Sequence, residues 1–370
     1  MRMPKAEETI LEIDLTALKH NFEYLKSKLK KDTKLLVVVK AYAYGSDAEE
    51  IANYLQQLDV DCFAVAYTKE GVALRDAGIT KPILVLHPQP INFKTLIERC
   101  LEPNLYSFNS LNRFLKIAEE EHQKNYPIHI KFNTGLNRLG FTEADIEGIY
   151  KTLEKTWAVK IISIFSHLAA SEDENERDFT LKQIGAFQQI SNTFNNTFSY
   201  QPIRHLCNTS GILNYSEAHL DMVRTGIGIY GFGNSEKENK ELKPIATLKS
   251  VISQIHTINE GESVGYNRAF KSDKLMRTAT IPIGHADGIG RQYGNGKGFV
   301  FINDKRAYIV GNVCMDMIMV NITNINCNEG DEVIIFGPQH SAENLANSTN
   351  SISYELLTSV SQRIKRIIRR

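Results

Sequence analysis

The chain has little cysteine, and the cysteines that it has are not spaced as a metal site requires. Five occur in 370 residues, at Cys62, Cys100, Cys207, Cys314 and Cys327. Their number is odd and they form no Cys-x-x-Cys pattern, which argues against a disulfide framework and against a zinc site. We therefore expect reduced thiols, no bound metal and a cytoplasmic location.

The chain also lacks an excess charge of one sign and any long apolar run. Its 43 acidic and 43 basic residues balance, so no charged surface indicates a nucleic-acid or membrane partner. No apolar run approaches the length of a membrane span, and residues 1–9 contain no apolar signal core. The length indicates two domains, or a barrel with an appendage.

Residues 35–45 carry the strongest functional signal in the chain. They read Leu-Leu-Val-Val-Val-Lys-Ala-Tyr-Ala-Tyr-Gly, and the apolar run predicts a strand buried on both faces, as in a parallel sheet. Lys40 closes this strand, at the end where parallel sheets bind ligands. A lysine in a partly apolar pocket has a lowered amine pKa and is a candidate Schiff-base nucleophile. From these residues alone, Lys40 could equally mark the point where a strand reaches the surface.

Apolar runs alternate with amphipathic stretches from residue 35 to about residue 230. The predicted strands are 35–39, 60–66, 82–87, 103–107, 127–132, 160–166, 203–207 and 221–230, with predicted helices such as 47–58, 69–77, 110–121, 143–156 and 178–196. Eight strands separated by helices predict a (β/α)8 barrel. An open doubly wound sheet gives a similar pattern. The count of eight, and the absence of a glycine-rich fingerprint after the first strand, favour the barrel.

The pattern changes after about residue 240, where β-like segments follow one another between Gly, Asn and Asp turns. They are 246–257, 261–266, 277–284, 298–302, 307–320 and 331–337. We predict an α/β chain, with the barrel over residues 12–240 and a mainly β domain over residues 241–370. The charged segment 235–242 is expected to be a solvated connection, and the tail 363–370 a closing strand or a surface segment.

Polar residues stand at the carboxyl ends of five predicted strands, where a barrel places its site. After Lys40, they occur in segments 128–140, 164–167, 204–211 and 222–228. Alone, each has an ordinary explanation, such as a hydrogen-bonded core histidine or a salt-bridged arginine. Together they predict a site at the mouth of the barrel.

The segment Val-Val-Lys-Ala-Tyr-Ala-Tyr-Gly (38–45) resembles the cofactor-lysine signature of alanine racemases that use pyridoxal 5′-phosphate (PLP). Other motifs of that family follow in chain order, and the resemblance covers residues 8–370. It implies that Lys40 carries PLP and that Tyr44 reaches the PLP phosphate. Tyr42 stands where the family usually has asparagine. The resemblance also implies that strand 8–14 joins the β domain.

Further cofactor contacts follow from the same resemblance. His167, in Phe-Ser-His-Leu-Ala, resembles the histidine that packs against the cofactor ring. Asn208, Thr209 and Ser210 resemble the Asn-Ser loop of the phosphate site, where threonine replaces the usual serine and keeps the hydroxyl. The backbone amides of Gly226 and Ile227 would add phosphate donors, because unpaired N–H groups after a strand bind anions.

Arg224, in Met-Val-Arg-Thr-Gly, matches the arginine that this family places at the pyridine nitrogen. Most PLP enzymes use a carboxylate there, which keeps the nitrogen protonated and makes the ring a strong electron sink. Arginine cannot accept that proton, because its own pKa lies above about 12. A carbanion is then only weakly stabilised, which suits prompt return of the proton and disfavours transamination and decarboxylation.

Arg138, in Asn-Arg-Leu-Gly, resembles the family arginine that helps bind the substrate carboxylate, for which a planar two-pronged donor is suited. Lys131 matches a lysine that is often carbamylated in this family and then orients that arginine. The resemblance therefore implies a small amino acid as substrate.

Racemisation needs proton transfer on both faces of a planar carbanion. Tyr266, in segment 263–270, resembles the family's catalytic tyrosine, which enters from the partner subunit. The resemblance thus implies a homodimer with shared active sites. Met315 resembles a partner residue at the substrate, with Cys314 and Asp316 in supporting positions.

Two residues depart from the family pattern. His285 stands where a tyrosine is common in an entrance segment, and Gln362 stands where many members have a phosphate-contacting tyrosine. These departures leave the entrance and one phosphate contact open.

The resemblance implies an isomerase that interconverts L-alanine and D-alanine and supplies D-alanine for peptidoglycan. A serine or broad-specificity racemase remains an alternative. Arg224 argues against a fold-related PLP decarboxylase, and residues 240–370 argue against a PLP-carrying homeostasis protein that has the barrel alone. The sequence also resembles racemase domains fused behind a muramoyl-peptide ligase, and its abrupt N-terminus would fit an excised domain.

Overall fold

A computed structural model of the protein describes residues 6–370. These residues form two compact units, one made of residues 19–43 and 48–242 and the other of residues 6–18, 44–47 and 243–370. The first five residues of the stretch in which we found no signal core lie outside the described part. None of the helices in residues 6–370 is both long and apolar enough to cross a membrane.

The first unit contains a closed barrel of eight parallel strands, which confirms the predicted fold. The strands are β2 (Lys34–Val38), β3 (Cys62–Val65), β4 (Ile83–Val85), β5 (Glu102–Leu105), β6 (Tyr126–Lys131), β7 (Val159–Phe165), β8 (Ile203–His205) and β9 (Met222–Thr225). They pair in chain order, and β9 closes the barrel against β2 through pairs such as Leu36 with Arg224. The carboxyl ends of all eight strands therefore meet at one mouth.

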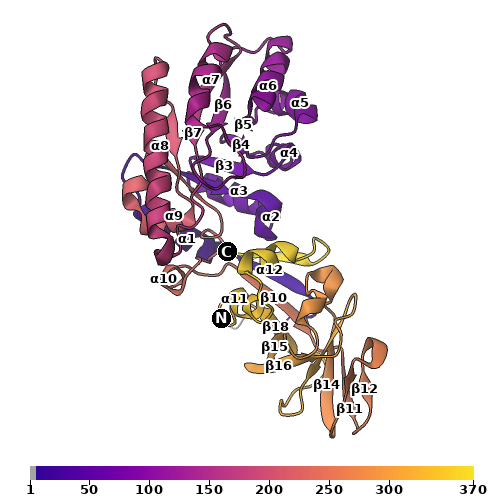
Figure 1. Ribbon diagram of the computed structural model, residues 1–370. Coiled ribbons are helices and arrows are strands. Elements are labelled where there is room, and N and C mark those ends of the chain that lie inside the picture. Colours follow the sequence, from indigo (N-terminus) through magenta and orange to yellow (C-terminus); the bar gives the residue numbers. More distant parts are fainter. Residues whose placement is uncertain (1–5) are drawn as a thin grey trace. The chain divides into compact units, whose positions relative to one another are not determined.

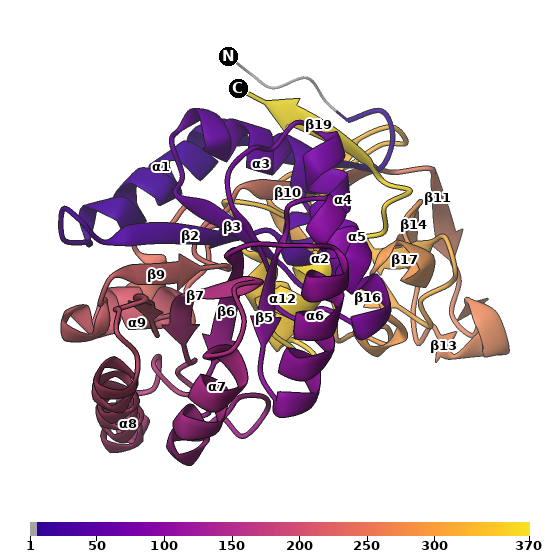
Figure 2. The same ribbon diagram turned by 90° about the horizontal axis from the view of Figure 1, so that it is seen from above.

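Helices lie outside the barrel strands, as Figure 2 shows for α4, α6, α7 and α8. The helices are α1 (Leu15–Ser27), α3 (Ala48–Gln57), α4 (Thr68–Asp76), α5 (Phe93–Glu98), α6 (Phe108–Glu120), α7 (Ile146–Leu153), α8 (Arg177–Thr197), α9 (Thr209–Asn214) and α10 (Glu236–Asn239). Helix α6 shows how sequence sets these elements. Ser107 caps its first turn, and Leu111, Phe114 and Ala118 form its buried face at helical spacing.

The segment labelled α2 (Lys40–Tyr44) is not a right-handed helix. Ala41, Tyr42 and Ala43 all have left-handed backbone angles, with φ between 52° and 55°, and Tyr44 has φ 53°. Residues other than glycine adopt this conformation at a cost of roughly 1–2 kcal/mol each. Such strain persists where surrounding contacts fix it and is typical of functional sites. The sequence pattern did not indicate this turn.

The second unit contains a sheet of nine strands in the order β11-β14-β17-β16-β15-β18-β10-β1-β19. Its strands are β1 (Ile10–Asp14), β10 (Ala246–Val251), β11 (Gln254–Ile258), β14 (Met276–Ile281), β15 (Phe299–Ile302), β16 (Lys305–Val310), β17 (Ile318–Asn321), β18 (Glu332–Phe336) and β19 (Lys365–Arg369). A hairpin of β12 (Ser263–Val264) and β13 (Phe270–Lys271), and helices α11 (Ala342–Asn347) and α12 (Ser353–Ser359), complete the unit. Figure 1 shows these elements from β10 to α12.

The first strand of the chain belongs to this sheet, as the resemblance implied for residues 8–14. This strand, β1, pairs with β10 and with β19. The tail therefore contains a closing strand, one of the two predicted outcomes. The predicted run 307–320 was wrong as one segment, because Gly311 has φ 67° and the chain loops out between β16 and β17.

The charged segment 235–242 is not merely a solvated connection. Within it, Glu238 is 3% exposed, and its carboxylate accepts hydrogen bonds from Ser210, Asn214 and the backbone of Asn234. The charge of this segment predicts a surface position, but the Glu238 carboxylate is a buried acceptor that ties α10 to α9.

Candidate active site

Arg224 on β9 is a buried cation at the barrel mouth. Its side chain is buried, and its guanidinium makes four hydrogen bonds, none of which uses Nε. Nη2 donates to the backbone oxygens of Ser166 and Leu206, at 2.7 and 3.1 Å. The two remaining contacts go to ring nitrogens: Nη1 donates to Nδ1 of His205 at 2.7 Å, and Nη2, whose two hydrogens are shared among three acceptors, lies 3.1 Å from Nδ1 of His167. Burial lowers the pKa of Arg224 to about 10, so the group remains a cation at neutral pH.

His167 and His205 are held in the neutral form by their burial and, second, by the charge of this arginine. A guanidinium can only donate, so the Nδ1 atom of each ring must accept, and the ring proton lies on Nε2. Desolvation, with the charge of Arg224 second, keeps the pKa of both histidines well below the usual value. Neither ring is therefore a general acid at neutral pH. Each serves as a fixed neutral neighbour of a cation.

Lys40 lies in the same unit, two residues beyond the end of β2, and is half-buried. Desolvation lowers the pKa of its amine, and the nearby charge of Arg138 lowers it further, while Glu70 acts in the opposite direction. The carboxylate of Glu70 also accepts hydrogen bonds from the backbone nitrogens of Ala41, Ala66 and Tyr67, at 2.6, 2.7 and 3.0 Å. Glu70 thereby ties the turn after Lys40 to the loop after β3.

Lys131 closes β6 and points into the barrel among other cations. Its side chain is buried, and its Nζ lies 5.9 Å from the centre of the Phe165 ring. Desolvation lowers the pKa of Lys131 to about 8, and the charges of Arg138, Arg224 and Lys40 add to the effect. A substantial fraction of this amine is therefore neutral and nucleophilic near physiological pH.

Arg138 projects from a closed loop that follows β6. Asn133 shapes the loop by accepting hydrogen bonds from the backbone of Gly135 and Asn137, at 3.1 and 3.0 Å. The loop returns to the strand end where Phe141 N donates to Lys131 O at 2.8 Å. The arginine is exposed, so its guanidinium is accessible to a ligand at the mouth.

A second group of polar atoms lies at the ends of β8 and β9. The hydroxyl of Thr209 lies 3.1 Å from that of Thr225 and accepts a bond from Gly228 N at 3.3 Å. A Cβ on Gly228 would lie 2.6 Å from the Thr209 methyl group, so only glycine allows this approach. The backbone N–H groups of Gly226 and Ile227 donate to no atom in residues 6–370. These donors are available to an anion.

Asn208 has a structural role beside this group. Its side chain accepts hydrogen bonds from Gly211 N at 2.9 Å and from the Ser171 hydroxyl at 2.7 Å, which caps α9. The predicted residues Lys40, Lys131, Arg138, His167, Asn208, Thr209, Arg224, Gly226 and Ile227 thus all belong to the barrel unit.

Tyr44 belongs to the second compact unit. It is 7% exposed, its ring centre lies 6.0 Å from that of Tyr354, and desolvation raises the pKa of its hydroxyl. The next residue, Gly45, has φ 82°, and its oxygen accepts a 2.8 Å bond from Arg366. A Cβ on Gly45 would lie 2.1 Å from the oxygen of Leu357, so the turn must end in glycine.

Tyr266, Cys314, Met315 and Asp316 come together in the second unit. Asn312 donates to the backbone oxygen of Tyr266 at 3.2 Å, which joins the tyrosine segment to the loop before β17. The Tyr266 side chain is 73% exposed and that of Met315 is 59% exposed. Two large groups that protrude this far are available to another chain.

Arg363 fixes the carboxylate of Asp316. Its guanidinium donates to Asp316 at 2.6 Å and to the buried Asp287 at 2.7 Å, and these bonds raise the pKa of Arg363. Its neighbour Gln362 is exposed. Sequence reasoning missed this arginine, because the alternation of basic and apolar residues in the tail resembles any surface strand.

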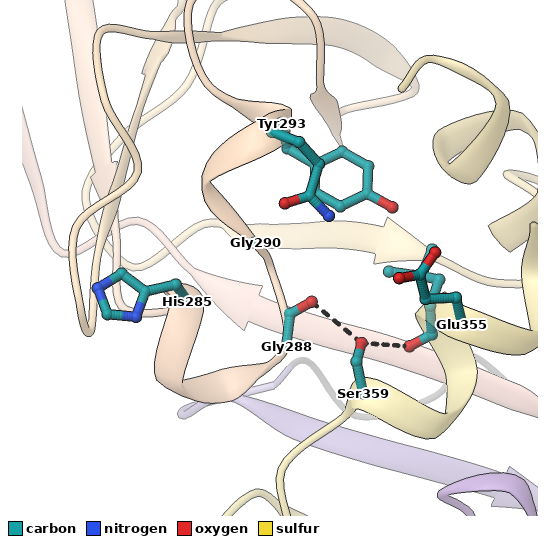
Figure 3. A pocket seen from close by; sticks show the side chains of 8 residues that line it. His285, Gly288, Gly290, Tyr293, Glu355 and Ser359 are labelled. Atoms are coloured by element: carbon teal, nitrogen blue, oxygen red, sulfur yellow. Dashed lines mark hydrogen bonds between the residues drawn. The ribbon is translucent and has the colours of Figure 1, made fainter. Parts of the chain in front are cut away.

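His285 lines a cavity of about 210 Å³ with Gly288, Tyr293, Glu355 and Ser359. Figure 3 shows that its ring points away from Tyr293 and Glu355. The hydroxyl of Ser359 forms part of the wall, where its one hydrogen is shared between the oxygens of Leu356 at 2.8 Å and Gly288 at 3.1 Å. The backbone of His285 bonds to Cys314 O at 3.0 Å, so the predicted entrance segment contacts the Met315 loop through its main chain.

An eight-stranded barrel with a mainly β second unit, and a lysine and a buried arginine at its mouth, defines the architecture that PLP racemases share with a class of PLP decarboxylases. Family models decide between them. The model of the N-terminal domain of alanine racemase matches residues 13–233, and that of the C-terminal domain matches residues 245–368.

Similar proteins agree with the family models over nearly the whole chain. The alanine racemase of Sorangium cellulosum is 33% identical over 377 residues, which cover 98% of this chain and 99% of that protein. The alanine racemase of Clostridium perfringens is 35% identical, with 97% and 95% coverage. The structure of alanine racemase from Bartonella henselae with covalently bound pyridoxal phosphate has a TM-score of 0.88 and 29% identity, and covers 98% of this chain and 100% of that one. The chain belongs to the alanine racemase family.

Proposed function

We propose that this protein interconverts L-alanine and D-alanine with PLP as its cofactor. The observation that carries the proposal is the environment of Arg224, a buried cation with its Nε–H outside the four bonds that hold it. An arginine leaves a pyridine nitrogen unprotonated, which limits the reaction to removal and return of a proton. Membership of the alanine racemase family supports the same reaction.

The described residues fit PLP at three points. The amine of Lys40 has a lowered pKa and can react with an aldehyde. The unused N–H groups of Gly226 and Ile227, beside the Thr209 hydroxyl, suit a phosphate. Arg224 supplies a donor to a ring nitrogen. When bound, PLP withdraws electrons from the carbon that carries the amino group, which makes the proton on that carbon removable.

Lys40 and Tyr266 are the two proposed bases. The exposed phenol of Tyr266 lies in a segment that protrudes from the second unit, which supports a role in the site of a partner subunit. We therefore propose a homodimer in which each site takes Lys40 from one chain and Tyr266 from the other. Each base would hold or deliver a proton on its own face of the substrate.

Arg138 is the proposed partner of the substrate carboxylate. A carbamate on Lys131 would supply the negative charge that the cluster of Arg138, Arg224 and Lys40 lacks. Its formation joins the neutral amine to carbon dioxide and releases one proton. We propose that this carbamate orients Arg138, and that Met315 limits the room beside the substrate side chain.

We place the reaction in the cytoplasm, where its product would serve peptidoglycan synthesis. The five cysteines are all free thiols, which supports a reducing compartment. The substrate in that setting is free alanine.

The test is to incubate the purified protein with PLP and, separately, with L-alanine, L-serine and L-lysine, and then to resolve the enantiomers by chiral chromatography. D-alanine should appear until the two enantiomers are equal. Formation of a decarboxylated amine, or of keto acid in place of D-alanine, would contradict the proposal.

A further inference from the structure

A line of hydrogen bonds crosses the barrel interior from Arg224 at the mouth towards the amino-terminal ends of the strands. Arg224 Nη1 lies 2.7 Å from His205 Nδ1, and His205 Nε2 lies 3.0 Å from the hydroxyl of Ser163. That hydroxyl lies 2.6 Å from His129 Nδ1, and His129 Nε2 lies 2.9 Å from the carboxylate of Glu102. The five residues come from β9, β8, β7, β6 and β5, one from each successive strand.

The chemistry of the groups gives this line one direction. The guanidinium can only donate, so His205 accepts at Nδ1 and donates from Nε2 to Ser163. Ser163 then donates to His129 Nδ1, and His129 donates from Nε2 to Glu102, which as a carboxylate can only accept. Every donor meets an acceptor when both histidines are neutral and carry the proton on Nε2.

The two ends of the line carry opposite charges. Within residues 6–370, no carboxylate lies within ion-pair distance of Arg224. The carboxylate of Glu102 is the charged acceptor at the far end, and its side chain is 14% exposed. It lies in the wall of a cavity of about 160 Å³, together with His129 and Ser163.

We propose that Glu102 is a positioning residue for Arg224, acting through His129, Ser163 and His205. The carboxylate keeps the proton of His129 on Nε2, which orients the Ser163 hydroxyl towards His129. The Ser163 oxygen then keeps the proton of His205 on Nε2, so that the unprotonated Nδ1 of His205 accepts from the arginine. This relay keeps the guanidinium charged and correctly oriented, with Nε left for the ring nitrogen of the cofactor. The inference rests on the proposed function for its catalytic consequence, but the hydrogen-bond relay itself does not depend on it.

The relay can be tested without cofactor by nitrogen NMR of the apoprotein labelled at histidine. We expect both His129 and His205 to be neutral and protonated on Nε2. In Glu102→Gln, the amide can donate or accept, so a second tautomer should appear at His129. A wild-type His205 that is protonated on Nδ1, or on both nitrogens, would overturn the relay. This measurement stands even where a variant fails to fold.

Kinetics test the catalytic consequence. Glu102→Gln should lower kcat for alanine about tenfold, the lower end of the loss found when a carboxylate behind a metal-bound histidine is removed, and change KM less than twofold. The matched control is Asp61→Asn. Asp61 lines the same cavity as Glu102, but within residues 6–370 its carboxylate accepts a hydrogen bond only from Leu35 N and takes no part in the relay. This control should keep the wild-type kcat.

Ser163→Ala breaks the relay in its middle and separates positioning from general packing. In that background Glu102→Gln should cause no further loss of kcat, whereas independent structural effects would add. Additive losses, or equal losses in Glu102→Gln and Asp61→Asn, would refute the positioning role. Failure of the wild-type protein to racemise alanine would instead count against the proposed function. The NMR measurement of the His129 and His205 tautomers would still show whether the hydrogen-bond relay exists.

Discussion

Glu70 Oε1 lies 2.6 Å from the backbone nitrogen of Ala41, the residue that follows Lys40. The other carboxylate oxygen accepts bonds from the backbone of Ala66 and Tyr67. One side chain on α4 therefore holds the start of the left-handed turn and the end of the neighbouring strand together. The main chain just after Lys40 is therefore fixed to the end of β3 through this carboxylate.

The first prediction is that Lys40 carries the cofactor. The purified protein should be yellow with PLP, and reduction with borohydride should fix the cofactor to the peptide that contains Lys40. Lys40→Ala should lose this label and racemase activity by at least about a thousandfold, because the base and the attachment point are removed together. Label on the Lys131 peptide in place of Lys40 would contradict the assignment.

The second prediction concerns the two faces of the substrate. The family resemblance assigns Tyr266 to the proton of L-alanine and Lys40 to that of D-alanine. In deuterated water, Tyr266→Phe should lose most racemisation while some deuterium still enters D-alanine, as measured by mass spectrometry after chiral separation. Racemisation retained equally in both directions would contradict the two-base scheme. Tyr308→Phe, an exposed tyrosine on β16, is a suitable control.

The third prediction is that activity requires two chains. Lys40→Ala and Tyr266→Phe should each be inactive, but mixing them under conditions of subunit exchange should restore activity. At equal concentrations about half of the dimers are hybrids, and each hybrid has one intact site and one site that lacks both bases. The mixture should therefore reach up to about a quarter of the wild-type activity. Exchange should be verified by mass, and absence of recovery despite exchange would exclude the shared site.

The fourth prediction is that the state of Lys131 depends on pH. With a pKa of about 8, the amine is about one-tenth neutral at pH 7, roughly 300 times more than at the ordinary value of 10.5. Labelled carbon dioxide should give a carbamate signal by NMR that grows from pH 6.5 to pH 8.5 and is absent in Lys131→Met. That variant should raise KM for alanine about tenfold, the value of one charged hydrogen bond to Arg138.

The same pKa gives a signed effect on the stability of the protein without carbon dioxide. Because the pKa of Lys131 is lower in the folded protein than in the unfolded chain, the folded state binds fewer protons. The free energy of unfolding should rise as pH increases from about 8 to about 10.5. Below pH 8, the charged Lys131 should destabilise the folded protein by its full, constant amount. Urea titrations of wild type and Lys131→Met at both pH values would show whether this dependence disappears in the variant.

The fifth prediction is a small substrate. Met315 and Tyr266 are bulky exposed groups proposed to close around the substrate side chain from the partner. Since one methylene or hydroxyl changes binding by only about 1–3 kcal/mol, serine should be turned over more slowly than alanine but measurably. Lysine should be rejected. A kcat/KM for lysine or arginine equal to that for alanine would make the protein a broad-specificity racemase.

The barrel and its mouth could be predicted because their signals are local. Each buried strand appears as an apolar run, and its last polar residue marks the mouth, as with Lys40 and Lys131. The relay from Arg224 to Glu102 could not be predicted in this way. Its contacts join neighbouring strands at pairs such as Glu102 with His129, and they depend on strand register, which a single sequence does not reveal.

The left-handed turn was missed for a different physical reason. Ala41, Tyr42 and Ala43 have no intrinsic preference for positive φ, which usually signals itself through glycine or asparagine. Contacts from distant residues, such as those of Glu70 with Ala41 and of Arg366 with Gly45, help to stabilise it. The sequence of residues 40–45 alone therefore does not predict this turn, because the residues that stabilise it are distant in the chain.

The pairing of β1 with β19 has a consequence for the order of folding. Ile10 lies in register with Lys365, and the other partner of β1, β10, begins at Ala246. During synthesis, β1 therefore leaves the ribosome long before either neighbouring strand exists, while the barrel strands that follow it can pair with one another as they emerge. The sheet around β1 can form only after β10 and β19 have emerged, and until then the unpaired edges of β1 must be kept from other strands.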